Sequence, residues 1–214
     1  YRVMFSMSNT IFVGLPVNIA LFVEKCIPFV LLYYVANTSL FWTIGVYGIC
    51  KDSGQSDFSV FSKENLKHIM SVPLMAFLLT VLAILMGIKL PKFLLDTCKY
   101  IGNLTTPLSL MFIGIIIHSV KLKEMHLGLD MIILLIGRFI ISPFLVFSFV
   151  KYMPIETMAK NVFVMESAMP VMTQTAIVAQ AYNADYKYAT VMITISTIAS
   201  ILFIPLYMVL LSGL

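Results

Sequence analysis

The chain has 214 residues, of which 60% are hydrophobic and 11% are charged, and its mean hydropathy is +0.99. A soluble domain carries about 25% charged residues because its surface must face water, so this composition excludes a soluble globular domain and a disordered segment. The net charge of +4 is scattered, and the three cysteines lie far apart without a CxxC pair. We therefore expect no nucleic-acid partner, no disulfide framework and no metal site.

Apolar stretches long enough to cross a membrane follow one another along the whole chain. They lie at 4–23, 27–50, 68–88, 100–120, 129–150, 158–182 and 187–212. A helix needs about 20 residues to cross about 30 Å of hydrocarbon. The stretches are continuous rather than alternating, and backbone in lipid must find its hydrogen bonds internally, so helices are expected. The predicted fold class is an all-α membrane protein with about seven transmembrane helices, multi-pass, in the bilayer of the cell membrane.

The charge on the connecting segments gives only a weak indication of orientation. One side of the predicted bundle, which includes the 51–67 loop, carries seven Lys and Arg residues, and the other side carries six. The positive-inside rule thus slightly favours a cytoplasmic location for the 51–67 loop.

Two charged residues lie well inside predicted spans, Arg138 in the fifth and Glu166 in the sixth. A charge at the bilayer centre costs about 3 kcal/mol on insertion scales, so such a residue usually faces a cavity or a partner. Both lie near mid-depth of consecutive spans, which would allow them to pair. Glu166 is a candidate to bind a proton or a cation, and Arg138 to hold a carboxylate or neutralise Glu166. The alternative is a fixed salt bridge that only holds two helices together.

The first and sixth spans each contain a mid-span proline, Pro16 and Pro170, with small and polar residues around it. Proline removes a backbone donor and crowds the preceding turn, so each helix is expected to kink or unwind there. Proline-interrupted spans in corresponding halves of a chain point to a midplane site, where half-helix N-termini attract an anionic substrate. The alternative is two ordinary kinks, since proline is frequent in membrane helices.

Polar side chains around these prolines are the candidate substrate ligands, because helical spacing places several of them on shared faces. The predicted substrate-binding residues are Asn9, Pro16, Asn18, Asn37, Pro170, Thr173, Gln174 and Thr175, and Arg138 and Glu166 are the predicted coupling or charge pair. For Asn37, interhelical hydrogen bonding is the alternative. The sequence shows no catalytic or metal-ligand cluster, so we expect no enzyme activity and no resident cofactor. The coupling ion is left open as H⁺ or Na⁺.

Several motifs, taken together and in order, resemble the auxin efflux carrier family of membrane transporters, including its bacterial members. They are Ser8-Asn9-Thr10 with Gly14-Leu15-Pro16, Asn37 with Phe41 to Gly45, Gly102 to Leu110, Arg138 with Pro143, and Glu166 to Pro170. The similarity runs along nearly the whole chain. It implies ten spans in two inverted repeats, with the fourth and ninth spans broken at prolines and crossing near the midplane. The first span here would be the family's fourth, so the first three would be absent.

The resemblance also implies a division of the chain into functional parts. Residues 1–50 would be transport-unit helices of a partial first repeat, 51–67 a cytoplasmic loop, 68–125 scaffold helices of the second repeat, and 126–214 its transport-unit helices. Scaffold helices in the family often form a homodimer interface, and the substrates are typically organic anions such as auxin, malate or malonate. The expected function is a secondary active transporter, an efflux carrier or permease, that moves a small organic anion by alternating access.

Other classes stay open on the sequence alone. A non-transporting membrane receptor needs no matched pair of broken helices and would bind its ligand without flux. A sodium-coupled anion symporter of a related inverted-repeat fold would differ in its dependence on the coupling ion. An intramembrane enzyme would need a nucleophile, a metal cluster or a carboxylate dyad at depth, and the sequence offers none.

Overall fold

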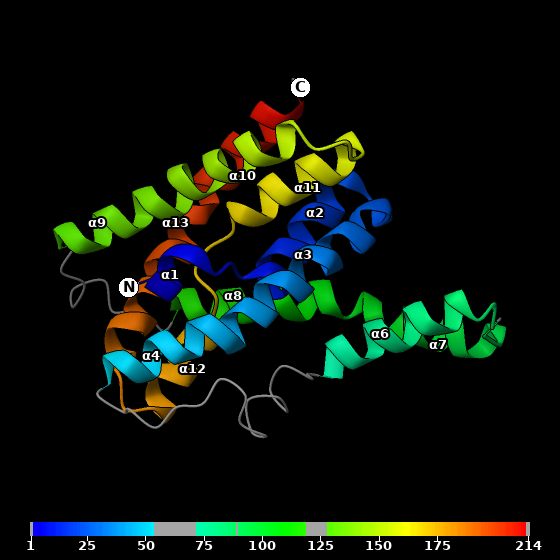
Figure 1. Cartoon of the computed structure of the whole chain (residues 1–214), viewed down its shortest axis with the longest axis horizontal. Coiled ribbons are helices and arrows are strands. Elements are labelled where there is room, and N and C mark those ends of the chain that lie inside the picture. The colour runs from blue at the N-terminus through cyan, green and yellow to red at the C-terminus, as the bar shows by residue number, and fades with distance from the viewer. Residues whose placement is uncertain (1, 54–71, 89, 119–127, 213–214) are drawn as a thin grey trace.

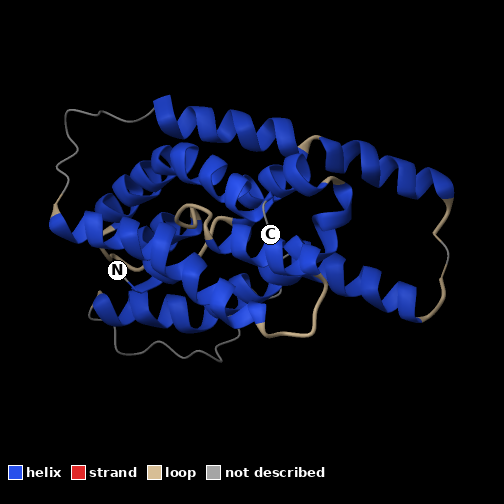
Figure 2. Ribbon diagram, turned by 90° about the horizontal axis from the view of Figure 1, so that it is seen from above, coloured by secondary structure: helices blue, strands red, loops and turns tan. Residues whose placement is uncertain are grey.

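The computed structural model describes residues 2–53, 72–88, 90–118 and 128–212. In these ranges the regular structure is helical, apart from one isolated antiparallel bridge (Figure 2). Most helices pack side by side in one bundle, and two of them extend away from it (Figure 1). The predicted 51–67 loop lies outside the described residues from position 54 onward. The all-helical class predicted from the sequence is confirmed.

The amino-terminal part of the bundle contains two long helical segments joined near Val23. Its elements are α1 (Arg2–Ser6), the π-helical turn η1 (Thr10–Gly14), α2 (Leu15–Phe22), the 3-10 turn η2 (Glu24–Cys26), α3 (Ile27–Leu40), the π-helical turn η3 (Phe41–Gly45) and α4 (Val46–Asp52). Val23 has a positive φ of 59°, which reverses the chain direction between α2 and α3.

The rest of the chain adds the two extending helices and the second half of the bundle. The elements are α6 (Val72–Leu85), α7 (Lys92–Asn103), α8 (Thr105–His118), α9 (Leu129–Ile136), the π-helical turn η5 (Gly137–Ile141), α10 (Ser142–Lys151), α11 (Thr157–Ser167), α12 (Gln174–Ala181) and α13 (Tyr186–Ser212). Helices α6 and α7 both extend away from the bundle (Figure 1), and the view from above shows them apart from each other (Figure 2).

Among the described residues, three helices are long and apolar enough to cross a membrane: Glu24–Asp52, Leu129–Lys151 and Tyr186–Leu211. They correspond to the predicted second, fifth and seventh spans. In the predicted third and fourth spans, α6 and α8 have 14 residues each, and parts of both spans lie outside the described ranges. The predicted first and sixth spans are helical but interrupted.

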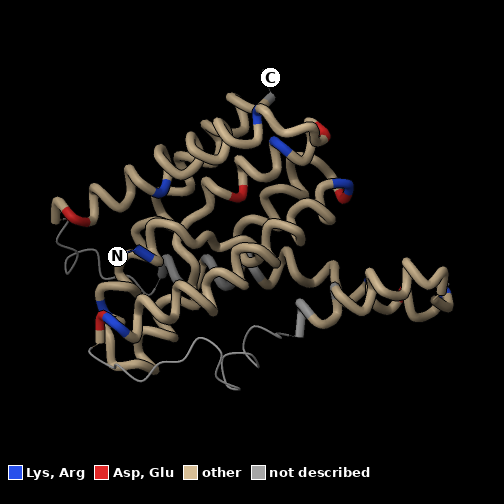
Figure 3. The backbone as a smooth tube through the Cα atoms, viewed as in Figure 1, with Lys and Arg blue, Asp and Glu red and all other residues tan. Residues whose placement is uncertain are grey.

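Apart from the buried Arg138 and Glu166, the charged residues of the bundle gather at its ends (Figure 3). This is the distribution that a lipid environment requires, because a charged side chain in hydrocarbon is costly. Many large apolar side chains on the outer faces of the helices are exposed. In a membrane protein these faces contact lipid.

One helix was not expected from the sequence. The segment between Lys89 and Lys99 was read as a charged connection between spans, but α7 begins at Lys92 and continues to Asn103. Its polar and apolar residues alternate with the helical period, which is typical of a helix lying at a membrane surface. Lys99 forms an ion pair with Glu24 at 3.8 Å. Because both side chains are more than half exposed, this pair contributes little stability.

Candidate functional site

The first helix interruption lies over Met7, Ser8 and Asn9, between α1 and η1. Pro16, where the sequence predicted the break, is instead in the first turn of α2. The prediction that Pro16 sits at the crossover is therefore wrong. Pro16 lies within the continuous helix Thr10–Phe22, which begins after the first break.

Pro16 widens its helix instead of ending it. Gly14, the last residue of η1, lies two positions before Pro16. Ile141, the last residue of η5, likewise lies two positions before Pro143. The proline ring crowds the carbonyl four residues earlier. A wider π-helical turn relieves this crowding and lets the helix continue, so both prolines follow a π turn within a continuous helix.

Asn37 of α3 holds the first break open. The backbone N–H of Ser8 donates to Asn37 Oδ1 at 3.1 Å, and Asn37 Nδ2 donates to the Ser8 carbonyl at 3.0 Å. The two backbone groups of Ser8 that helical hydrogen bonds would use are therefore engaged by one side chain. Both residues are buried, and backbone at such depth needs partners within the protein.

The second interruption runs from Ala168 to Thr173, between α11 and α12, and it contains Pro170. The Ala168 and Met169 N–H groups still donate to carbonyls of α11, and other backbone groups of the interruption find partners outside α11 and α12. The N–H of Val171 donates to Ser196 Oγ of α13 at 3.1 Å. The predicted break near Pro170 therefore coincides with a real interruption in the helix.

The two interruptions meet backbone to backbone. Ser8 and Val171 form the antiparallel bridge. The N–H of Asn9 donates to the Pro170 carbonyl at 2.9 Å, and the N–H of Met172 donates to the Met7 carbonyl at 3.2 Å. Each break thus supplies partners for the other, as irregular backbone inside a membrane requires. We call this meeting point of residues 7–9 and 168–173 the crossover.

Side chains reinforce the crossover. Asn9 Nδ2 donates to Thr173 Oγ1 at 2.9 Å, which joins the two breaks a second time. Asn9 is buried and Thr173 is half-buried. Two helices begin immediately after the breaks, η1 at Thr10 and α12 at Gln174. Helix N-termini carry partial positive charge, so two such ends lie at the crossover.

Arg138 of η5 binds both breaks at once. Its Nε donates to the Met169 carbonyl at 2.7 Å and its Nη1 to the Phe5 carbonyl at 3.0 Å, and its Nη2 donates to Ser8 Oγ. The side chain is 1% exposed. The rigid fork of the guanidinium group suits three acceptors in different directions. Arg138 therefore places a buried positive charge beside the crossover and holds the two breaks together.

Glu166 lies in the last turn of α11 and is fully buried. Its Oε1 accepts a hydrogen bond from Asn18 Nδ2 of α2 at 2.8 Å, and the same nitrogen donates to the Gly14 carbonyl at 2.9 Å. A Cβ at Gly14 would collide with the Glu166 carboxyl group, which would have to move to make room for it. Within the described part of the chain Glu166 and Arg138 form no ion pair with each other. The direct pair considered from the sequence is absent, because the N–H groups of Arg138 donate to acceptors in and beside the breaks.

The predicted ligands thus separate into groups. Asn9, Asn37, Pro170, Thr173 and Arg138 meet at the crossover, whereas Asn18 joins Glu166 on α2 and α11. Gln174 and Thr175 begin α12; Gln174 is half-buried and Thr175 is buried.

Sequence reasoning missed Ser8, Gly14 and Ser196 as site residues. The Ser8-Asn9 pair carried a usable signal, because adjacent Ser and Asn side chains compete with helical hydrogen bonds. Gly14 was quoted only as part of a motif, and its contact with Glu166 depends on how α2 packs on α11. Ser196 is one of several hydroxyl residues in α13, and no signal distinguished it.

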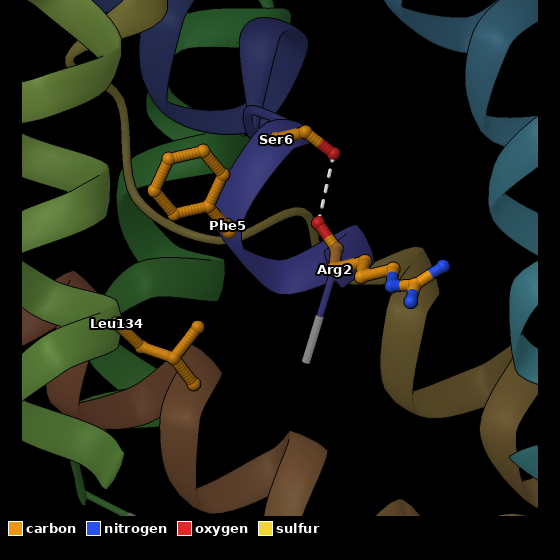
Figure 4. Close-up of a pocket in the computed structure, with 4 residues that line it drawn as sticks. All are labelled: Arg2, Phe5, Ser6 and Leu134. Atoms are coloured by element: carbon orange, nitrogen blue, oxygen red, sulfur yellow. Dashed lines mark hydrogen bonds between the residues drawn. The ribbon is translucent and has the colours of Figure 1, made fainter. Parts of the chain in front are cut away.

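A hollow of about 420 Å³ lies elsewhere, between α1 and α9, and is lined by Arg2, Phe5, Ser6 and Leu134. In Figure 4, Phe5 and Leu134 lie on one side of α1, while the Arg2 side chain points away from them and Ser6 Oγ donates to the Arg2 carbonyl. The hollow is nearly apolar and includes none of the predicted ligands. At the crossover itself Ser8, Asn9, Met169 and Val171 are buried, and we call this arrangement closed.

Comparisons with known proteins identify the family of the chain. Residues 2–208 match the family described as membrane transport protein. The chain is 30% identical over 207 residues to a protein of Methanocaldococcus jannaschii described as the uncharacterized transporter MJ1031; the match covers 94% of this chain and 64% of that protein. The chain thus spans less than two thirds of this relative's length. No solved structure matches the chain. The chain belongs to the membrane transport protein family, that of the auxin efflux carriers, as its motifs indicated.

Proposed function

We propose that the protein is a secondary active transporter that carries a small organic anion across the cell membrane by alternating access. Membership of a transport family supports the general role. The observation that carries the proposal is the crossover, where two interrupted helices meet at Ser8 and Val171. Discontinuous helices that meet inside the membrane are the usual binding sites of secondary transporters.

The charge at the crossover favours an anion. The N-termini of η1 and α12 both begin there, and a helix N-terminus attracts negative charge through its dipole and its unpaired N–H groups. The buried guanidinium of Arg138 adds a full positive charge beside them. Among the predicted ligands, Asn9 and Thr173 can donate hydrogen bonds to a carboxylate.

The surroundings of the crossover favour an organic molecule over an inorganic ion. Met7, Met169 and Met172 are buried within or beside the breaks. Methionine is flexible and fills irregular spaces, so it adapts to apolar groups of different shapes. A small carboxylate with an apolar body would find charge complementarity at the helix ends and apolar contact at the methionines.

The contacts between the breaks are few enough to exchange with a substrate. The bridge consists of two backbone hydrogen bonds, from Asn9 and Met172, and the Asn9–Thr173 side-chain bond adds a third. A carboxylate that accepts hydrogen bonds from Asn9 and Thr173 would replace their mutual bond. The closed arrangement would then open on one side of the crossover at a time.

The division of the chain into a transport unit and a scaffold belongs to the same proposal. The bundle that contains both breaks would move, and the extending helices α6 and α7 would belong to a fixed scaffold through which two copies associate (Figure 1). The apolar residues of α6 are largely exposed, among them Leu79, Ile84 and Leu85. The complete carrier would have ten helices in two inverted repeats.

Uptake by proteoliposomes that contain the complete protein tests the proposal. Labelled malate, malonate and indole-acetate are supplied one at a time, and saturable uptake of at least one is expected. Thr173→Val should reduce this uptake, because it removes the hydroxyl group that faces Asn9. Thr80→Val is the matched control, since Thr80 is exposed on α6 and bonds only within its own helix.

Two other outcomes would contradict the proposal, and a third would identify the coupling ion. Binding of one of these acids without flux would favour a receptor. Flux that requires a sodium gradient would favour a sodium-coupled symporter. Equal uptake by the Thr173→Val and Thr80→Val variants would remove the crossover from the transport path.

A further inference from the structure

Glu166 and Asn18 share an unusual deficit of hydrogen bonds. Both side chains are fully buried. Glu166 Oε2 and Asn18 Oδ1 have no hydrogen-bond partner among the described residues. Buried polar atoms are nearly always paired, so an unpaired group needs an explanation. Here two unpaired acceptor atoms belong to side chains that already touch each other.

The existing hydrogen bond between them is of the kind that forms one half of an acid–amide pair. Asn18 Nδ2 donates to Glu166 Oε1 at 2.8 Å. A carboxylic acid and a primary amide can form two parallel hydrogen bonds, in which the amide N–H donates to one acid oxygen and the acid O–H donates to the amide oxygen. The second bond needs a proton on Glu166 Oε2. A single proton would thus give both unpaired oxygens a partner.

An ionised Glu166 carboxylate would have too few hydrogen-bond donors at this position. It would need donors for both of its oxygens, because burying a charge without partners is costly. The described surroundings give Oε1 one donor and Oε2 none. The nearest backbone of η1 offers no room for water on that side either, because the carboxyl group lies directly against Gly14.

A metal cation fits this pair less well than a proton does. Hard cations such as Mg²⁺ and Ca²⁺ take about six or more oxygen ligands. In the described ranges the pair offers two free oxygens, and the neighbouring Gly14 carbonyl already accepts from Asn18. No group of three His, Cys, Asp or Glu side chains suited to a metal ion occurs among those residues.

We propose that Glu166 and Asn18 form a proton-binding site in which the Glu166 carboxyl group is protonated in this closed conformation. The pair joins α2, which follows the first break, to α11, which precedes the second. Release of the proton would leave acceptor atoms of Glu166 and Asn18 facing each other and so weaken the contact between the two half-helices. Proton release and uptake would in this way accompany opening and closing of the crossover; this coupling rests on the proposed transport function.

Other titratable groups, on elements packed around Glu166, interact with it electrostatically. They are Cys26 of η2, Tyr33 of α3 and Arg138 of η5. Arg138 is the one whose charge is fixed, and it lies at the crossover, so the charge on Glu166 and the state of the crossover are linked. Any pH dependence must therefore be assigned to Glu166 by substitution.

Infrared spectroscopy of the complete protein in lipid vesicles tests the proton site without any need for transport. A protonated carboxyl group has a C=O stretching band distinct from that of a carboxylate. We expect such a band at neutral pH, lost in Glu166→Gln and kept in Glu156→Gln, an exposed glutamate at the start of α11. Absence of the band from the unsubstituted protein, or its persistence in Glu166→Gln, would overturn the proposal. Loss of the band on adding Na⁺ at constant pH would also overturn it, in favour of a sodium site.

Uptake tests the coupling separately. The ratio of uptake with and without an imposed pH gradient is measured in each variant. We expect the gradient to stimulate uptake in the unsubstituted protein and in Glu156→Gln, and to have no effect in Glu166→Gln. Uptake that ignores the gradient in the unsubstituted protein would overturn the coupling. Absence of all uptake would instead contradict the proposed transport function and would leave the infrared result as the test of the proton site.

Discussion

The two helix breaks look alike in sequence but form in different ways. Each belongs to a span with a mid-span proline. The second break contains its proline, Pro170, and extends over six residues, whereas the first is three residues long and ends before Pro16. The first break depends on the side-chain amide of Asn37, which takes both backbone groups of Ser8.

The comparison shows that a proline alone does not decide where a membrane helix stops. Pro16 and Pro143 lie in the first turns of helices that continue from π-helical turns. A break needs other partners for the backbone groups that the helix releases. Asn37 supplies them at the first break and Ser196 helps to supply them at the second.

The largest expected effect comes from removing the side chain that serves both breaks. In Arg138→Met, the Met169 and Phe5 carbonyls and the Ser8 hydroxyl lose their donor. Each unpaired buried group costs about 1–3 kcal/mol, and loss of a buried charge offsets part of this cost. We expect a loss of about 2–4 kcal/mol in unfolding free energy, measured by denaturation in detergent.

Lys151→Met, at an exposed end of α10, is the control for loss of a positive charge. If the two variants were equally stable, Arg138 would not be the link between the breaks.

Asn37 should matter most to the first break, although its Nδ2 also contacts Met172 Sδ at 3.9 Å, and Ser196 should matter most to the second. Asn37→Leu removes two hydrogen bonds to the Ser8 backbone, whereas Ser196→Ala removes one, to Val171. We expect losses of about 2–3 kcal/mol and about 1 kcal/mol respectively. Hydrogen exchange at the two breaks would show which one opens. In Asn37→Leu, exchange that accelerates more at the Val171 amide than at the Ser8 amide would contradict the assignment.

The contact between Gly14 and Glu166 joins the half-helices on one side of the crossover. Gly14→Ala would push a methyl group into the Glu166 carboxyl group, so we expect it to destabilise the protein by about 1–3 kcal/mol. Gly48→Ala in α4 is the control, because nothing lies within 4 Å of its added methyl group. There we expect a slight gain from helix propensity. Gly14→Ala should also cost less when combined with Glu166→Ala, and additive effects would rule out the contact.

The smallest effect is expected from the proline outside the break. Pro16→Ala should change the stability by less than about 1 kcal/mol, since an alanine is compatible with the first turn of α2. Pro170→Ala should change stability and uptake more, because Pro170 lies in the break itself. Denaturation and uptake of both variants compare them. A larger loss of uptake in Pro16→Ala would return the site to the position predicted from the sequence.

The sequence predicted the features that depend on composition along the chain. Continuous apolar runs gave the helical class, and the rarity of charge in lipid singled out Arg138 and Glu166, both of which are buried. It did not predict their partners. The depth of a residue within a span follows from its position in the sequence. Whether Arg138 forms a salt bridge with Glu166 or hydrogen bonds to the breaks depends on how distant segments pack together.

The same reason explains the error over Pro16. A proline is visible in the sequence, but the amide that stops the first helix comes from Asn37, 29 residues after Ser8. Helix α7 was not predicted, because lysines between two apolar stretches indicate a loop. In an amphipathic surface helix the same lysines face water.

The central claim is that the two breaks meet at a site that must move during transport. Cysteines placed at Ser8 and Val171, in a protein whose own Cys26, Cys50 and Cys98 are replaced by alanine, test this most directly. Ser8 and Val171 lie opposite each other in the antiparallel bridge, where facing Cα atoms are about 4.5–5.5 Å apart, a separation that a disulfide bond can span. The account predicts that oxidation cross-links the pair and stops uptake, and that a reducing agent restores it. Failure to cross-link, or undiminished uptake by the cross-linked protein, would contradict it.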